Sequence, residues 1–191
     1  MIRAFIAITP PPTLQQTMAE VRQVFQGFAL RWRWVTPDHI HLTLRFLGNM
    51  PDESVPPLLQ VMEQAAQGQT AFPLRARALG CFPHPARPRV LWVGLDDPNQ
   101  ALGRLNERLM AALTPLGFPP EDRPFHPHLT LARVQNMMPS SHLLSMLQTY
   151  QNQDFGEFLV TQLHIVQSQL QRGGAVHTIL RSVTLQSSDY F

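Results

Sequence analysis

Two short segments of the chain contain the same combination of histidine and threonine. His41-Leu42-Thr43-Leu44 lies in the first half, and His128-Leu129-Thr130-Leu131 follows at an interval of 87 residues. The reference pKa of histidine is near 6.5, so one imidazole of a facing pair can accept a proton while the other delivers one. Threonine hydroxyls two residues further on can donate hydrogen bonds to phosphoryl oxygens. The combination predicts acid–base chemistry on a cyclic phosphodiester that requires no metal.

Each segment has the alternating pattern of a strand, which divides its side chains between two faces. Apolar residues lie on one face, and we expect that face to belong to the core. The other face carries His39, His41 and Thr43 in the first copy and His126, His128 and Thr130 in the second. Strict alternation places Phe46 on the core face. It also places Arg133 on the wrong face for the site, unless the strand is twisted or bulged there.

The similarity extends past the motifs themselves. The same interval pairs Asn49 with Asn136, Met50 with Met137 and Ser54 with Ser141. Internal self-similarity of this kind indicates a duplication. We therefore expect one bilobal domain over residues 1–191, with pseudo-repeats near 39–54 and 126–141 that each give a histidine and a threonine to a shared site.

The composition excludes several other mechanisms. All 15 basic residues are arginine, and the net charge is only +2. Without lysine the protein can use neither a P-loop phosphate grip, nor a Schiff base, nor the lysine–nucleotide intermediate of ATP-dependent ligases. Arginine suits phosphate-bearing partners, because the guanidinium fork matches pairs of phosphate oxygens.

The single cysteine and the apolar runs bear on location. Cys81 has no local signature of a nucleophile, so packing is its expected role, and a lone thiol suits a reducing cytoplasm. The apolar start of the chain is too short for a signal peptide, and no run reaches 18 apolar residues. We expect a cytoplasmic protein without a membrane partner.

Local patterns predict an α+β fold. Helices are expected at 11–27, 52–67, 99–114 and 140–150. Strands are expected at 2–8, 40–47, 70–80, 88–95, 127–133, 157–169 and 175–185. The last two would pair through the turn at 172–174, which favours antiparallel pairing over a doubly wound sheet.

With both motifs intact, the chain resembles the two-histidine phosphoesterase superfamily, whose mark is a pair of His-x-Thr-hydrophobic segments. The opening Arg3 to Ile8, the segment Val90 to Gly94 and the segment Arg123 to Arg133 are similar to its RNA 2',3'-cyclic phosphodiesterase (2'-5' RNA ligase-like) branch. The resemblance implies a bilobal duplicated fold, with two antiparallel sheets flanking a central cleft and helices on the outside. It also implies hydrolysis of RNA 2',3'-cyclic phosphate ends to 2'-phosphates. Some members also join RNA ends 2'-5', weakly, reversibly and without ATP.

The resemblance assigns roles by motif position. It makes His41 the proton donor to the leaving oxygen and His128 the proton acceptor that activates water. The expected substrate-binding residues are Thr43, Thr130 and Arg133 around the phosphate, with Phe5 and Phe46 as candidates to stack on a base. No cofactor is expected. The expected partners are RNA with 2',3'-cyclic phosphate ends or cyclic nucleotides, bound by a monomer.

Other interpretations remain open. The protein would be a non-catalytic RNA-end or cyclic nucleotide binding module if the pocket only recognised phosphate. The His-x-His pairs formed with His39 and His126 also suggest metal ligands, although neither motif contains an acidic residue or a cysteine. A metal-dependent hydrolase would lose activity with a chelator.

Several residues outside the motifs receive provisional roles. Surface or packing roles are expected for His84, His142, His164 and His177, and core roles for Trp32, Trp34 and Trp92. Arg87 and Arg89 lie in a proline-rich loop, where they are candidates for contact with an RNA backbone.

Overall fold

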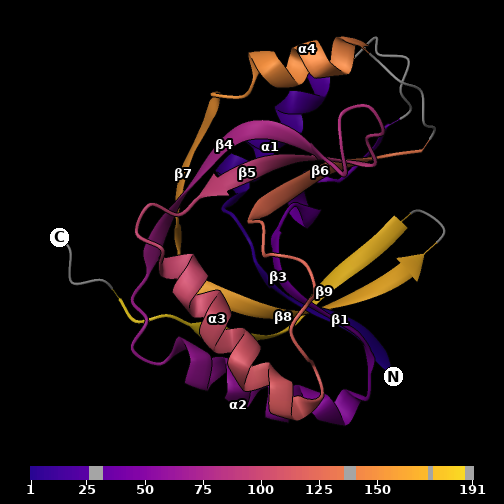
Figure 1. The fold of residues 1–191 in the computed structure, drawn as a ribbon. Helices are drawn as coiled ribbons and strands as arrows, with labels where there is room; N and C mark the ends of the chain where they lie inside the picture. The colour runs from indigo at the N-terminus through magenta and orange to yellow at the C-terminus, as the bar shows by residue number, and fades with distance from the viewer. Residues whose placement is uncertain (26–31, 136–140, 172–173, 188–191) are drawn as a thin grey trace.

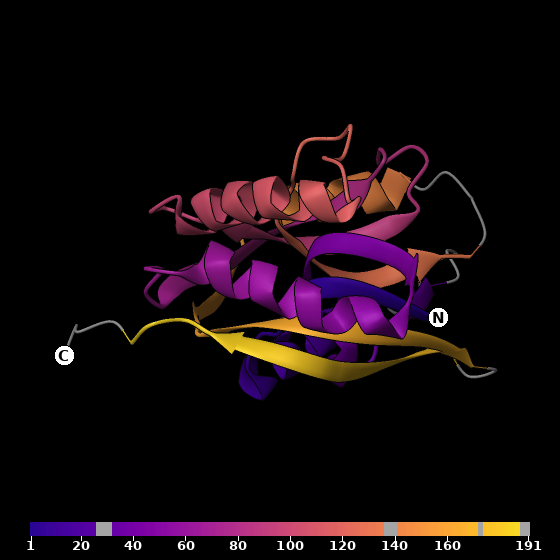
Figure 2. The same ribbon diagram turned by 90° about the horizontal axis from the view of Figure 1, so that it is seen from below.

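The chain forms one curled antiparallel sheet with helices on its outer side (Figures 1 and 2). The structure is a computed structural model and describes residues 1–25, 32–135, 141–171 and 174–187. Within them, the strand order is β7-β4-β5-β6-β3-β1-β8-β9, with β2 beside β6. Every pair of neighbouring strands is antiparallel, which agrees with the predicted α+β class.

The predicted strands agree with the observed ones to within a few residues, with two exceptions. The strands are β1 (Ile2–Ile8), β2 (Trp32–Trp34), β3 (Leu42–Met50), β4 (Phe72–Phe82), β5 (Val90–Asp96), β6 (His128–Val134), β7 (Asp154–Val160), β8 (Gln162–Gln171) and β9 (Gly174–Thr184). The prediction missed β2, which has only three residues. It also merged β7 and β8, which are separated only by Thr161 and together read as one run of strand-forming residues.

The predicted helices are all present. They are α1 (Pro12–Val24), α2 (Val55–Ala66), α3 (Ala101–Leu113) and α4 (Ser141–Thr149), with short 3-10 turns η1 (Pro37–His39), η2 (Asp52–Ser54) and η3 (Thr114–Leu116). Asp97 caps α3, because its carboxylate accepts hydrogen bonds from the backbone N–H groups of Ala101 and Gly103 at 2.9 and 3.0 Å. Predicted helical residues 26, 27 and 140 and turn residues 172 and 173 lie outside the described part.

The two motif strands meet at the middle of the sheet through a single residue pair. Leu42 of β3 pairs with Leu129 of β6, and both side chains are completely buried. The resemblance to the two-histidine phosphoesterases implies two separate sheets. This prediction was wrong, because the Leu42–Leu129 pair joins the two groups of strands into one sheet.

The two halves of the sheet share an order of elements. The first contains β1, α1, β3 and α2, and the second contains β5, α3, β6 and α4, so a helix precedes and follows each motif strand. In Figures 1 and 2, α2 and α3 lie side by side on the outside of the sheet. The duplication itself stays a prediction, and Asn136 and Met137 of the second pseudo-repeat lie outside the described residues.

A buried arginine gives a further connection between the halves. The guanidinium of Arg45 in β3 donates a hydrogen bond to the backbone carbonyl of Pro119. It also lies 3.2 Å from the Glu121 carboxylate. Pro119 and Glu121 belong to the segment that leads from α3 into the second motif, so this contact holds that segment against the first motif strand.

The main core lies between the helices and the outer face of the sheet. Phe5, Ala7 and Val166 form a separate small cluster on the other face, which is the face that carries the motif histidines. Cys81 is buried in the main core, and burial raises the pKa of its thiol to about 11, which confirms a packing role. In the described part of the chain, no helix is long and apolar enough to span a membrane.

Candidate active site

The structure brings the two motifs next to each other. Because Leu42 and Leu129 are paired and point into the core, their neighbours His41, Thr43, His128 and Thr130 lie on the opposite face of the two strands. All four are partly buried. The sequence prediction that the motifs share one face of the fold is therefore met by the strand register.

Each imidazole is held by a hydrogen bond to a backbone carbonyl, and the two bonds are equivalent. Nδ1 of His41 lies 2.7 Å from the carbonyl oxygen of His39, and Nδ1 of His128 lies 2.7 Å from the carbonyl oxygen of His126. A carbonyl only accepts, so Nδ1 carries the proton in each ring. The neutral rings therefore keep their lone pair on Nε2, and Nε2 is the atom at which each ring can exchange a proton.

The surroundings of both rings favour the neutral form. Burial lowers the pKa of His41 to about 4, and the nearby His177, His39 and His128 act in the same direction. Burial also lowers the pKa of His128, with smaller contributions from His126 and Arg133. The bonds to the backbone carbonyls oppose both shifts. Both histidines are therefore neutral in the free protein at pH 7.

The two threonine hydroxyls are open to a ligand. Across the residues that the structure describes, neither Thr43 nor Thr130 makes a side-chain hydrogen bond. A partly buried hydroxyl without a partner is well suited to bind an oxygen atom of a ligand. The hydroxyls lie on the same two strands as the histidines.

A bulge follows the threonine in each motif strand. In β3, Thr43 pairs with Ala7 and Arg45 pairs with Ile6, so Leu44 is the extra residue. In β6, Thr130 pairs with Trp92 and Ala132 pairs with Leu91, which makes Leu131 the extra residue. The two bulges occupy equivalent positions of the two motifs.

These bulges correct the expected orientation of two site residues. Beyond each bulge the alternation is reversed, so Phe46 and Arg133 leave the sheet on the face of the histidines. Phe46 is 58% exposed, and its ring centroid lies 6.0 Å from that of Phe5. The expectation that Phe46 faces the core was therefore wrong, and Arg133 lies on the site face as its proposed role requires.

Rings from two strands contact His41. Phe5 of β1 stacks on it with centroids 4.7 Å apart and an interplanar angle of 25°. His177 of β9 contacts its edge at 5.2 Å and also lies 4.7 Å from His39. Phe5 is only 3% exposed and stacks on the imidazole, so its ring is not open to a nucleobase.

Two aromatic residues surround His128. Phe82 of β4 meets the imidazole edge-on at 5.0 Å, and Trp92 of β5 lies 6.1 Å from it and 4.9 Å from His126. The indole of Trp92 lies over Gly80, where a Cβ atom would approach the ring to 2.1 Å. Glycine at position 80 is therefore what allows Trp92 to occupy its place beside the second motif.

Sequence reasoning missed three of these contacts. His177 carries no motif and lies 136 residues from His41, so no local signal assigns it to the site. Phe82 is likewise unmarked in the sequence. The alternation in Val90-Leu91-Trp92-Val93-Gly94 does place Trp92 on one face of its strand, although it does not say which face.

The metal alternative finds no ligand set in the described residues. No group of three or more histidine, cysteine, aspartate and glutamate side chains lies together in a way that could hold an ion. His39 lies 3.7 Å from the Asp38 carboxylate, and its carbonyl serves His41 instead. The carbonyls of His39 and His126 instead hold the imidazoles of the two motifs.

Known proteins resemble the chain over nearly its full length. The family model described as "2'-5' RNA ligase superfamily" matches residues 10–172. A protein of Aeropyrum pernix named RNA 2',3'-cyclic phosphodiesterase is 33% identical, covering 90% of this chain and 96% of its own. A protein of the same name from Thermus thermophilus is 32% identical, covering 97% and 91%.

Solved structures give the same result. The crystal structure of TT0787 from Thermus thermophilus has a TM-score of 0.82 at 31% identity and covers 97% of this chain and 98% of its own. Escherichia coli LigT complexed with 3'-AMP has a TM-score of 0.76 at 26% identity, covering 96% and 98%. This chain therefore belongs to the 2'-5' RNA ligase superfamily, the two-histidine phosphoesterases that its motifs resemble.

Proposed function

We propose that the protein hydrolyses RNA 2',3'-cyclic phosphate ends to 2'-phosphates without a metal, with His41 and His128 as its acid–base pair. The observation that carries the proposal is the matched pair of imidazoles, each fixed through Nδ1 and free at Nε2, on neighbouring strands of one face. The names of the relatives from Aeropyrum pernix and Thermus thermophilus support the substrate class.

The reaction follows from the two nitrogen atoms. Nε2 of neutral His128 takes a proton from water as its oxygen bonds to phosphorus. The P–O3' bond breaks, and protonated His41 gives its Nε2 proton to the leaving O3', so the phosphate remains on O2'. The hydroxyls of Thr43 and Thr130 and the guanidinium of Arg133 bind the non-bridging oxygens as their negative charge increases.

The position of Phe46 favours His41 as the acid. The leaving O3' belongs to the ribose that carries the base, so the acid and the base-binding surface should lie in the same half of the site. Phe46 is the largely exposed aromatic ring on the His41 side, and a base can stack on it. Arg133, the residue at the equivalent position, lies on the His128 side and suits the phosphate.

Because the pKa values of both histidines are lowered, the substrate has a role in keeping His41 protonated. An acid must carry a proton, yet His41 is neutral in the free protein at pH 7. The phosphodiester is an anion, and a negative charge beside an imidazole raises its pKa. The bound substrate thus supplies part of the stabilisation that the protonated acid needs, and we expect a bell-shaped pH dependence.

The same site would also explain joining of RNA ends. If the 5'-hydroxyl of a second RNA replaces water, the same P–O3' bond breaks and a 2'-5' linkage forms. No ATP is consumed, because the strained cyclic phosphate is the activated group. Water is far more concentrated than RNA ends, so ligation should be the minor activity.

The test is incubation of the purified protein, in the presence of a chelator, with 2',3'-cyclic nucleotides and with an oligomer that ends in a cyclic phosphate. We expect turnover of both and a product with its phosphate on O2'. A non-catalytic binding module would bind the substrates without converting them, and a metal-dependent hydrolase would be inactive in chelator. Gel filtration of the same sample checks the expected monomer.

A further inference from the structure

Two arginines lie directly opposite each other at the far end of β6. Arg33 of β2 is the cross-strand partner of Arg133, so the two side chains leave the same face of the sheet. Because of the bulge at Leu131, this is the face that carries Thr130 and His128. Like charges at directly opposed positions destabilise a sheet. An anion bound between them would remove that cost.

The backbone of a third arginine lies beside this pair. The carbonyl of Arg89 accepts a hydrogen bond from the N–H of Val134 at 2.9 Å. The next residue, Val90, pairs with Arg133. The side chains of Arg33, Arg89 and Arg133 are all exposed. Arg33 of β2 and Arg133 of β6 therefore lie together at one end of the site, with the backbone of Arg89 beside them.

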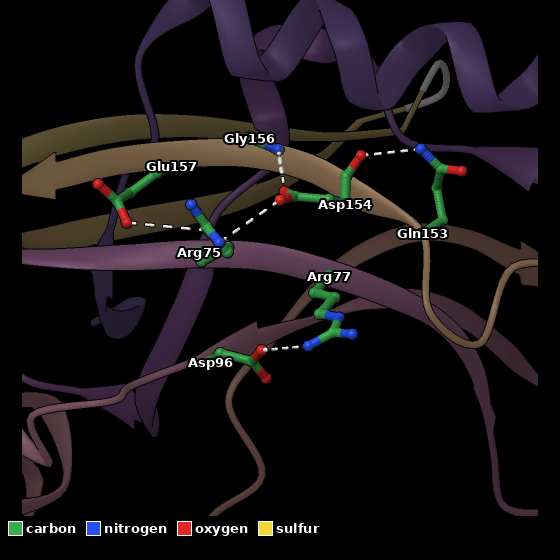
Figure 3. Close-up of polar contacts among 7 residues, drawn as sticks. All are labelled: Arg75, Arg77, Asp96, Gln153, Asp154, Gly156 and Glu157. Carbon is green, nitrogen blue, oxygen red and sulfur yellow. Dashed lines mark hydrogen bonds and ion pairs between the residues drawn. The ribbon is translucent and has the colours of Figure 1, made fainter.

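Two other arginines on this face have carboxylate partners. Figure 3 shows Arg75 between Asp154 and Glu157, at 3.7 and 3.9 Å, and Arg77 beside Asp96 at 3.9 Å. Their charge is compensated within the sheet. The arginines at the end of β6 differ from these two.

Within the described residues, no acidic side chain lies at ion-pair distance from Arg33, Arg89 or Arg133. Arg33 and Arg133 therefore form an uncompensated pair of positive charges on the face of the reaction site. Arg133 is the member close enough to His128 to influence its pKa. Arg33 lies one strand further away.

We propose that Arg33 binds a backbone phosphate of the RNA upstream of its reacting end. The inference rests on the proposed function, because it places the reacting phosphate between His41 and His128. Arg133 then serves that phosphate, and Arg33 serves the next one that a longer chain supplies. Guanidinium groups bind phosphate oxygens in pairs, and such backbone contacts increase affinity without reading the base sequence.

The test compares R33Q with the wild type on a 2',3'-cyclic mononucleotide and on an RNA oligomer that ends in a 2',3'-cyclic phosphate. At low salt we expect R33Q to lower kcat/KM about tenfold more for the oligomer than for the mononucleotide. The plot of log affinity against log salt concentration should become less steep, by about 0.7 for each lost phosphate contact. R75Q is the matched control, because Arg75 is exposed on the same face but already paired, and it should not discriminate between the substrates.

Equal losses on both substrates, or no loss on the oligomer, would overturn the inference. Equal discrimination by R75Q and R33Q would also overturn it, because only overall charge would then matter. R33E should discriminate more strongly than R33Q, which guards against a replacement contact by glutamine. Binding of an oligomer with a 2'-phosphate end, followed by fluorescence anisotropy, requires no turnover. If the wild type hydrolyses neither substrate, the proposed function fails and the binding experiment still decides this inference.

Discussion

The two halves of the site hold their histidines in the same way but surround them differently. Each imidazole is bonded through Nδ1 to the carbonyl two residues earlier, at 2.7 Å in both cases. The edge of His128 meets Phe82, whereas the edge of His41 meets His177, which can itself be charged. A symmetric backbone thus presents two chemically distinct bases. The difference suits a reaction in which one ring must accept a proton and the other must donate one.

The largest effect should come from the histidines themselves. Removing either ring in H41N or H128N deletes one proton transfer, so kcat should fall about 1000-fold. A cyclic nucleotide should still bind, which calorimetry can measure. A phosphodiester with a good leaving group, such as a nitrophenyl ester, separates the roles, because it needs no acid. H41N should recover much of its activity on that substrate and H128N should not; the reverse pattern would exchange the two assignments.

A substitution that displaces Trp92 should impair the His128 half of the site selectively. In G80A the new Cβ would overlap the indole, which must leave its present place beside His126 and His128. Misplacement of the imidazole should lower kcat about 10- to 100-fold with the overall fold retained, as circular dichroism can verify. G103A is the matched control, since its Cβ would have no neighbour closer than 3.9 Å. Unchanged activity in G80A would mean that Trp92 does not position His128.

Making the two halves alike should alter the pH profile more than the rate. H177F places beside His41 the residue type that contacts His128, and it removes a group whose charge lowers the pKa of His41. The pKa of His41, followed by NMR of its ring, should rise, and the limb of the pH profile that belongs to His41 should move upward with it. At pH 7, kcat should change by no more than about threefold.

Burial and His39 lower the pKa of His177, and Asp38 raises it. His41, just before β3, also faces it, while Phe5 of β1 and Ser168 of β8 carry no charge. H84Q removes an exposed histidine elsewhere and serves as the control. A His41 resonance that titrates identically in H177F and wild type would show that the two rings are not coupled.

The smallest effect should appear in acid stability. The folded state holds the pKa of His41 at about 4, against 6.5 in the unfolded chain. The unfolded chain therefore binds more protons below pH 6.5, and stability falls as the pH decreases toward 4. The full contribution is roughly 3 kcal/mol. Denaturant unfolding of H41N should show a shallower loss between pH 6.5 and 4; parallel curves for H41N and wild type would contradict this origin.

Much of this site could be predicted because its signal is local. Two strands with alternating polarity place His41, Thr43, His128 and Thr130 on common faces, and the structure agrees. What alternation cannot predict is an extra residue in a strand. The bulge after each threonine reverses the pattern, and for that reason the orientation of Phe46 was wrong.

The remaining errors have similar causes. β2 is too short to give a periodic signal, so the pairing of Arg33 with Arg133 was invisible. His177 reaches the first motif only through the curl of the sheet, which no sequence interval encodes. The prediction of two separate sheets was wrong for a related reason, because one residue pair is enough to connect the two groups of strands.

The connection between the two halves of the sheet bears on the width of the site. Three features on the side of the sheet away from the histidines join the halves: the Leu42–Leu129 pair, the packing of α2 beside α3, and the contact of Arg45 with the segment before the second motif. In the proposed mechanism, the gap between the two Nε2 atoms would therefore depend on side chains outside the phosphate-binding face. Substitutions in the outer helices offer a way to adjust which phosphodiesters fit, while the chemical groups themselves stay unchanged.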